Sequence, residues 1–238
     1  MDKRTRIFTA LDSADLDAVR ALAQSIAGAV DGLKLGLEFF TALGPAGIRG
    51  IAQLGLPIFL DVKLHDIPNT VAGAIRSLAP LAPYYLTLHA AGGTDMLNAA
   101  RETAHEEAAR LGLTPPRLLA VTVLTSLDEG DLAQQGVAGP AQDQVVRLAE
   151  LARRAGIDGI VSSPREIAAI RAALGDGFDI VVPGIRPGGG GAQDQKRVMT
   201  PGEAVRAGAS ALVIGRPITS AADPAQAAAD IRAEVDAA

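Results

Sequence analysis

Eight short apolar segments alternate with longer, Ala-rich amphipathic segments along this chain of 238 residues. The expected strands are residues 7–11, 32–36, 57–61, 85–89, 118–124, 159–162, 179–182 and 211–214. The expected helices are residues 16–30, 44–54, 69–81, 95–111, 142–155, 163–174, 201–207 and 223–235, with Asp15 and Thr200 as caps and Pro201 in a first turn. Because parallel strands need long crossover connections, this alternation predicts an α/β fold with a parallel sheet.

The number of units distinguishes between the two common parallel architectures. Eight strand–helix units in about 250 residues indicate a (β/α)8 (TIM) barrel. An open doubly wound sheet is the alternative, but residues 9–13, which follow the first strand, contain none of the glycines of a dinucleotide-binding turn. No linker or low-complexity segment divides the chain, and the glycines at 188–191 fit a loop. We therefore expect one barrel domain spanning residues 1–238.

Composition restricts the possible partners. The net charge is −5 and no basic stripe with interleaved aromatic residues is present, so we expect no nucleic-acid partner. No segment approaches the roughly 20 apolar residues of a membrane span. The chain has no Cys, which excludes disulfides and thiolate metal ligands. Together with an N-terminus that shows no signal peptide, these features predict a cytoplasmic protein that does not bind membranes.

The segment DVKLHDIPNT, residues 61–70, carries the clearest chemical signal. On an extended chain Asp61 and Lys63 point to the same side, and Asp66 follows just past the expected strand end. An ammonium between two carboxylates at the end of a buried strand is costly to desolvate, so such clusters are typical of catalytic sites. Lys34 lies in the second strand. The alternative for both lysines is that they extend from strand ends to solvent.

A second set of residues predicts an anion site. Arg186 follows the seventh strand, and Gly215 and Arg216 follow the eighth, where barrels of this kind often bind phosphate. A guanidinium donates paired hydrogen bonds to phosphate, and the backbone at Gly215 can approach an anion closely. Gln195 could add a neutral donor from the glycine-rich loop. The alternative is that both arginines form ordinary surface salt bridges.

With these residues placed, the chain resembles the orotidine 5′-phosphate decarboxylase family. The motifs are FLDVKLHDIPNT at 59–70, AVTVLTS at 120–126, PGIRP at 183–187 and VIGRPIT at 213–219. The resemblance implies a barrel enzyme, free of metal and cofactor, that works as a homodimer. It would convert orotidine 5′-phosphate to uridine 5′-phosphate and CO2, the final step of de novo UMP synthesis.

The resemblance also implies residue roles. Lys63 would stabilise the C6 carbanion and protonate it, Asp61 and Asp66 would flank it, and Lys34 would complete an alternating charge array. Asp66 and Thr70 would reach into the neighbouring subunit's site. The implied substrate contacts lie at strand ends: Asp12, Lys34, Asp61, Ile67, Thr70, Thr125, Arg186, Gln195, Gly215 and Arg216.

Three rival interpretations remain at this stage. Related magnesium-dependent decarboxylases and aldolases of sugar phosphates share the Asp-x-Lys-x-x-Asp pattern, but they carry a metal-binding carboxylate on strand two, where this chain has Lys34. A metal site could also be built from Asp61, His65, Asp66 and His89. We expect His89 instead to be a hydrogen-bonded histidine at a strand end. A non-catalytic nucleotide-binding barrel is the third possibility, because fold alone does not specify function.

Overall fold

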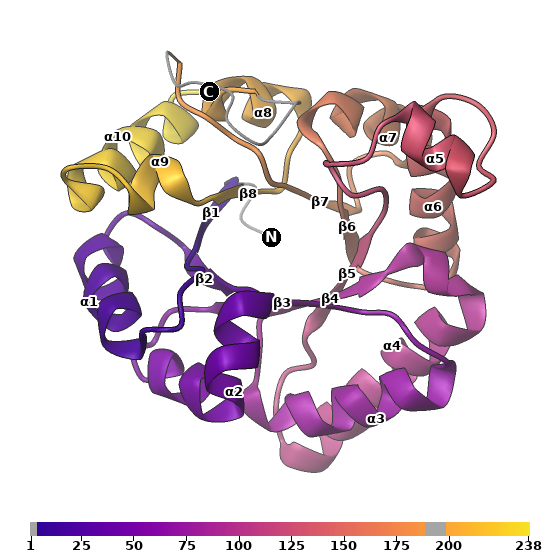
Figure 1. The fold of residues 1–238 in the computed structure, drawn as a ribbon, viewed down its shortest axis with the longest axis horizontal. Helices are drawn as coiled ribbons and strands as arrows, with labels where there is room; N and C mark the ends of the chain where they lie inside the picture. Colours follow the sequence, from indigo (N-terminus) through magenta and orange to yellow (C-terminus); the bar gives the residue numbers. More distant parts are fainter. Residues whose placement is uncertain (1–3, 189–198) are drawn as a thin grey trace.

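A closed parallel barrel forms the centre of the molecule. The structure is a computed structural model that describes residues 4–188 and 199–238. Within these residues, eight strands pair in sequence order and β1 closes the ring against β8 (Figure 1). The strands are β1 (Arg6–Ala10), β2 (Gly32–Leu35), β3 (Ile58–Leu64), β4 (Tyr85–His89), β5 (Arg117–Val121), β6 (Gly159–Val161), β7 (Asp179–Val182) and β8 (Ala211–Ile214). The predicted (β/α)8 barrel is confirmed.

Helices surround the barrel on the outside (Figure 1). They are α1 (Leu16–Ile26), α2 (Leu37–Ala52), α3 (Pro68–Leu78), α4 (Gly93–Leu111), α5 (Glu129–Gln134), α6 (Ala141–Arg154), α7 (Ile167–Leu174), α8 (Pro201–Ala207), α9 (Arg216–Thr219) and α10 (Pro224–Asp236). Short 3-10 turns occupy Ala79–Leu81, Ala90–Gly92 and Pro164–Glu166. The predicted caps are confirmed, since Asp15 and Thr200 accept backbone N–H bonds in the first turns of α1 and α8. Among the described residues, no helix is long and apolar enough to span a membrane.

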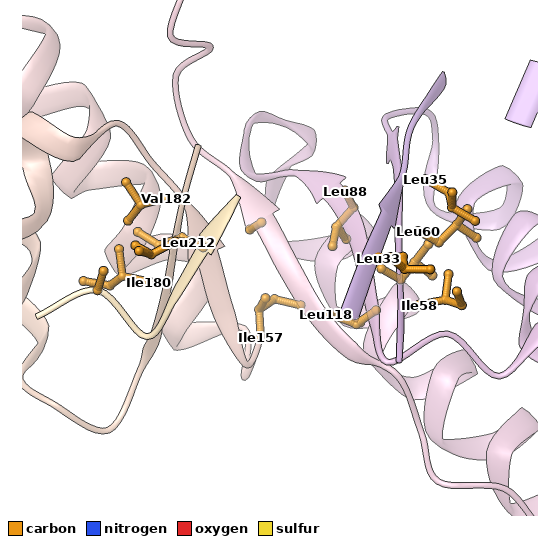
Figure 2. Close-up of a cluster of buried hydrophobic side chains, with 14 of the residues drawn as sticks. Leu33, Leu35, Ile58, Leu60, Leu88, Leu118, Ile157, Ile180, Val182 and Leu212 are labelled. Carbon is orange, nitrogen blue, oxygen red and sulfur yellow. The ribbon is translucent and has the colours of Figure 1, made fainter. Parts of the chain in front are cut away.

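Buried side chains form two layers around the strands. One layer lies between the strands and the helices, and it includes Leu33, Leu60 and Leu212, which Figure 2 shows pointing away from the barrel axis. The other fills the barrel interior: Phe8, Phe59, Tyr85, Leu119, Val181, Ala211 and Val213. Gly32 makes room for this interior, because a Cβ there would lie 2.4 Å from the ring of Phe8. The filled interior leaves the carboxyl ends of the strands as the place for a site.

Several element boundaries differ from the predicted ones. The helix expected from residue 44 begins at Leu37, and Gly44 and Pro45 mark a kink inside it, where Gly44 has φ 56°. Helices α5 and α9 were not among the predicted segments, and β5 ends at residue 121 instead of 124. The short polar sequence of α5 has no apolar period long enough to recognise. The most consequential difference is that β3 continues to Leu64 instead of ending at residue 61.

The extension of β3 contains a bulge. Leu60 pairs with Leu86 and Leu64 pairs with Leu88, so three residues of β3 lie opposite a single residue of β4, Thr87. Within this bulge Lys63 adopts φ 49°, a left-handed conformation that is unfavourable for a residue with a side chain. Bulges re-aim side chains, and they are frequent beside active sites.

Candidate active site

Two adjoining cavities open at the carboxyl ends of the strands. The smaller, of about 160 Å³, is lined by charged and apolar side chains that include Asp61, Lys63 and Thr125. The larger, of about 440 Å³, is lined by Asp12, Gly215 and the two arginines at 186 and 216, among others. Lys34, Pro183 and Val213 line both cavities, so the two form one continuous site.

Four charged side chains form an alternating row across this site. Nζ of Lys63 lies 2.8 Å from Oδ2 of Asp61, and Nζ of Lys34 lies 3.6 Å from the same oxygen. Lys34 also contacts Oδ1 of Asp12 at 3.3 Å. The side chains of Lys34 and Lys63 are only 11% and 29% exposed, so neither lysine extends freely into solvent. The row Asp12, Lys34, Asp61, Lys63 comes entirely from β1, β2 and β3 and the residues directly after them.

Thr87 of β4 connects this row to its neighbouring strand. Its hydroxyl donates to Oδ1 of Asp61 at 2.9 Å and accepts from the backbone N–H of Lys63, also at 2.9 Å. Sequence reasoning did not single out Thr87. The available signal was a hydroxyl inside an otherwise apolar strand, two residues before His89.

The electrostatics of Asp61 follow from these contacts. Burial alone raises the pKa of this carboxyl group, because desolvation disfavours the charged form. The charges of Lys34 and Lys63, together with hydrogen bonds from Lys63 and Thr87, outweigh burial and lower the pKa of Asp61 below its ordinary value. Asp61 is therefore an ionised carboxylate at neutral pH, held between two amines.

The segment directly after β3 lies apart from this row in the single chain. Residues 65–70 are exposed, and Ile67 is 66% exposed. The carboxylate of Asp66 accepts a hydrogen bond from the N–H of Ile67 at 2.7 Å. Among the described residues Asp66 forms no ion pair with Lys63, and Asp66, Ile67 and Thr70 line neither cavity. The expectation from spacing that both carboxylates flank Lys63 is therefore wrong within one chain, because the strand ends and the segment turns outward.

Three of the four predicted phosphate residues line the larger cavity. Arg186 follows β7, and its guanidinium donates to the carbonyl of Ile185 at 3.0 Å. Gly215 and Arg216 follow β8, with Arg216 at the start of α9. Gln195 lies outside the described residues. The arginines thus lie just after the last two strands, whereas the alternating row comes from the first three strands and the residues directly after them.

The two histidines near the site contact each other. The rings of His65 and His89 lie 5.1 Å apart between centroids. Burial, and then the charges of His65 and Lys63, lower the pKa of His89 despite the opposing charge of Asp61. His89 does end β4, but in the described part of the chain its ring makes no hydrogen bond, contrary to expectation. No group of three or more His, Cys, Asp or Glu side chains among the described residues is arranged to hold a metal ion.

Fold and site together define a barrel protein with a row of alternating lysines and carboxylates beside an arginine-lined cavity. Residues 5–231 match the sequence profile of the Orotidine 5′-phosphate decarboxylase / HUMPS family. The chain belongs to this family, as its motifs predicted.

Individual relatives agree with this membership. An orotidine 5′-phosphate decarboxylase of Paramagnetospirillum magneticum is 52% identical over 96% of this chain and 97% of the relative. The one from Sphingopyxis alaskensis is 55% identical over 95% of this chain and 97% of the relative. Among solved structures, the orotidine 5′-phosphate decarboxylase of Lactobacillus acidophilus has a TM-score of 0.85 and 36% identity, covering 98% of this chain and 99% of that one.

Proposed function

We propose that this protein is a carboxy-lyase that converts orotidine 5′-phosphate to uridine 5′-phosphate and CO2. The observation that carries the proposal is the alternating row Asp12, Lys34, Asp61, Lys63 beside a cavity lined by two arginines. The full-length relatives named as orotidine 5′-phosphate decarboxylases support the same activity.

The chemistry explains why an ammonium is needed. When the bond between C6 and the carboxylate breaks, CO2 leaves and its bonding electron pair stays on C6, where the pyrimidine ring delocalises it poorly. The ammonium of Lys63 favours this developing charge more than the starting carboxylate, which is what accelerates a reaction. Lys63 then donates a proton to C6 and is left as an amine, which regains its proton from water. Asp61 holds Nζ of Lys63 in place at 2.8 Å.

The larger cavity binds the phosphate and ribose of the substrate. Arg186 and Arg216 bind the phosphate through charge-assisted hydrogen bonds, and Asp12 contacts the ribose hydroxyls. Thr125 contacts the pyrimidine in the smaller cavity that it lines. Because the phosphate is remote from C6, its binding energy positions the pyrimidine against the charged row.

The outward-turning segment after β3 supports a homodimer. It presents an exposed Ile67 beside a carboxylate, Asp66, that has no cation partner among the described residues. Leu37 and Leu124 are also exposed, and they follow the carboxyl ends of other strands. In the dimer, Asp66 and Thr70 enter the partner's site, so that Asp66 becomes the second carboxylate near Lys63. Burying such apolar side chains is a usual driving force for association.

The decisive experiment is a turnover assay that follows the loss of orotidine 5′-phosphate absorbance and the release of CO2. The wild-type protein should turn the substrate over. Lys63→Ala should still bind uridine 5′-phosphate, because the arginines remain, yet lose at least the roughly 10²–10⁴-fold typical of a general acid. Near-normal turnover by Lys63→Ala would refute the assigned role, and an inactive wild-type protein would leave the rival of a non-catalytic nucleotide-binding barrel.

The same assay excludes or revives the magnesium-dependent rival. Nζ of Lys34 lies 3.6 Å from Asp61, so an ammonium already occupies the place beside the carboxylate where a divalent cation would need an oxygen ligand. Turnover should therefore be unchanged in excess chelator. Loss of activity with a chelator, restored by added Mg²⁺, would overturn the proposed function in favour of metal-dependent chemistry on a sugar phosphate.

A further inference from the structure

We propose that Thr87 is a positioning residue that fixes the direction of the Lys63 side chain. Its single hydroxyl bonds the backbone of Lys63 in the bulge and the carboxylate of Asp61 at the same time. The catalytic readout of this proposal rests on the proposed function. Its structural readout does not, because the geometry can be observed without turnover.

The bulge leaves part of β3 without regular ladder partners. In β3 the residues 61–63 lie opposite only Thr87, so regular strand pairing cannot satisfy all of their backbone groups. The N–H of Lys63 instead donates to Oγ1 of Thr87 at 2.9 Å. A buried N–H without an acceptor is strongly unfavourable, so this hydroxyl stabilises the bulge itself.

Lys63 has an unfavourable backbone conformation within the bulge. A φ of 49° is unfavourable for lysine, and such conformations persist only where the surroundings over-determine them. The hydrogen bond to Thr87 is the contact that holds the N–H in this orientation. Without it, the backbone can relax toward an extended conformation, which turns the side chain of Lys63 away from its present direction.

The two carboxylate oxygens of Asp61 have different partners. Oδ2 contacts both amines, at 2.8 Å to Lys63 and 3.6 Å to Lys34. Oδ1 accepts the hydroxyl proton of Thr87 at 2.9 Å. The hydroxyl thus sets the plane of the carboxylate, and the carboxylate sets the position of Nζ of Lys63.

The chemistry of threonine fits both tasks at once. A hydroxyl has one proton to donate and lone pairs to accept, and here the proton goes to Asp61 while a lone pair receives the N–H of Lys63. Thr87 is 0% exposed, and β-branching restricts its χ1 angle, so the hydroxyl has little freedom to turn elsewhere. Because Thr87 lines neither cavity, its influence on the substrate passes through Lys63 and Asp61.

The test compares Thr87→Val, which keeps the shape and removes the hydroxyl, with Thr87→Ser, which keeps the hydroxyl. Thr87→Val should lower kcat by about 100-fold, the cost of a misplacement near 1 Å, with the affinity for uridine 5′-phosphate little changed. Thr87→Ser should recover most of the lost kcat. Thr5→Val is the matched control, because its buried hydroxyl donates to the carbonyl of Ala209 at 3.0 Å, far from the row, and it should leave kcat unchanged.

Each outcome decides the proposal. An active wild-type protein whose Thr87→Val variant keeps wild-type kcat overturns the role of Thr87, as does a Thr87→Ser variant as impaired as Thr87→Val. An inactive wild-type protein contradicts the proposed function alone. Thr87 is then judged from the crystal structure of Thr87→Val, where an unchanged φ at Lys63 and an unchanged contact with Asp61 would overturn the proposal. If Thr87→Val does not fold, Thr87→Ala replaces it in the same comparisons.

Discussion

Removing the charge of Asp61 should destabilise the folded protein at neutral pH. Asp61→Asn preserves the size of the side chain but removes the charge that separates the buried amine of Lys34 from the partly buried amine of Lys63. At an effective dielectric constant near 20, a unit charge attracts Lys63 at 2.8 Å by about 6 kcal/mol and Lys34 at 3.6 Å by about 5 kcal/mol. Desolvation of all three groups offsets much of this gross attraction, as it does in other buried ion pairs.

The net cost is set by the uncompensated charges that remain. Removing one partner of a buried ion pair typically destabilises a protein by about 3–5 kcal/mol. We therefore expect Asp61→Asn to lower the free energy of unfolding at pH 7 by about 3–5 kcal/mol. The control is Asp17→Asn, because Asp17 is almost fully exposed and pairs with Arg20 at 3.6 Å, and such surface pairs contribute less than about 1 kcal/mol.

The assay is urea unfolding of wild-type protein and both variants, measured from pH 7 downward. The pKa of Asp61 is lowered in the folded protein, so its contribution is present above the ordinary carboxyl pKa of about 4 and is lost as the pH falls through the folded value. The difference between wild type and Asp61→Asn should therefore shrink below about pH 4. A difference of less than about 1 kcal/mol at pH 7 would refute the coupling of the row.

Three further predictions test other parts of the site. Burial and nearby positive charges lower the pKa of His89, so the stability contributed by its neutral ring is present above about pH 6.5 and is lost as the pH falls. The free energy of unfolding of His89→Gln should therefore fall less than that of wild type between pH 7 and pH 5. Equal losses in the two proteins would contradict the lowered pKa. Arg216→Ala should impair orotidine 5′-phosphate far more than the substrate without its phosphate, and an equal effect on both would show that Arg216 does not bind the phosphate. Mixing inactive Lys63→Ala with inactive Asp66→Ala subunits should restore part of the activity, because one site of each mixed dimer carries neither substitution. No recovery of activity despite subunit exchange would contradict a site shared between subunits.

Much of the fold could be predicted because its signals are local and periodic. Eight apolar runs separated by amphipathic helices specify a barrel whichever residue ends each strand. The barrel in turn predicts that Asp12, Lys34 and Asp61 converge, since the carboxyl ends of its strands share one mouth. Arg186 and Arg216 fall at the same mouth for the same reason.

The remainder depends on pairing between strands, which the sequence does not display. The bulge in β3 is a mismatch of three residues against one, and it is visible only when β4 lies alongside. For that reason neither the left-handed conformation of Lys63 nor the role of Thr87 could be predicted. Spacing along the chain did not indicate the outward turn of Asp66 either, because spacing was taken as proximity in space; only the family resemblance implied that Asp66 reaches toward a neighbouring subunit.

The origins of the two halves of the site have a consequence for how new activities arise in such a barrel. The alternating row of amines and carboxylates comes from the first three strands and the residues directly after them, whereas the two arginines lie just after the last two strands. Under the proposed function, exchange of the second half of the gene, or variation confined to its loops, would therefore change which molecule is bound and leave the alternating row unchanged.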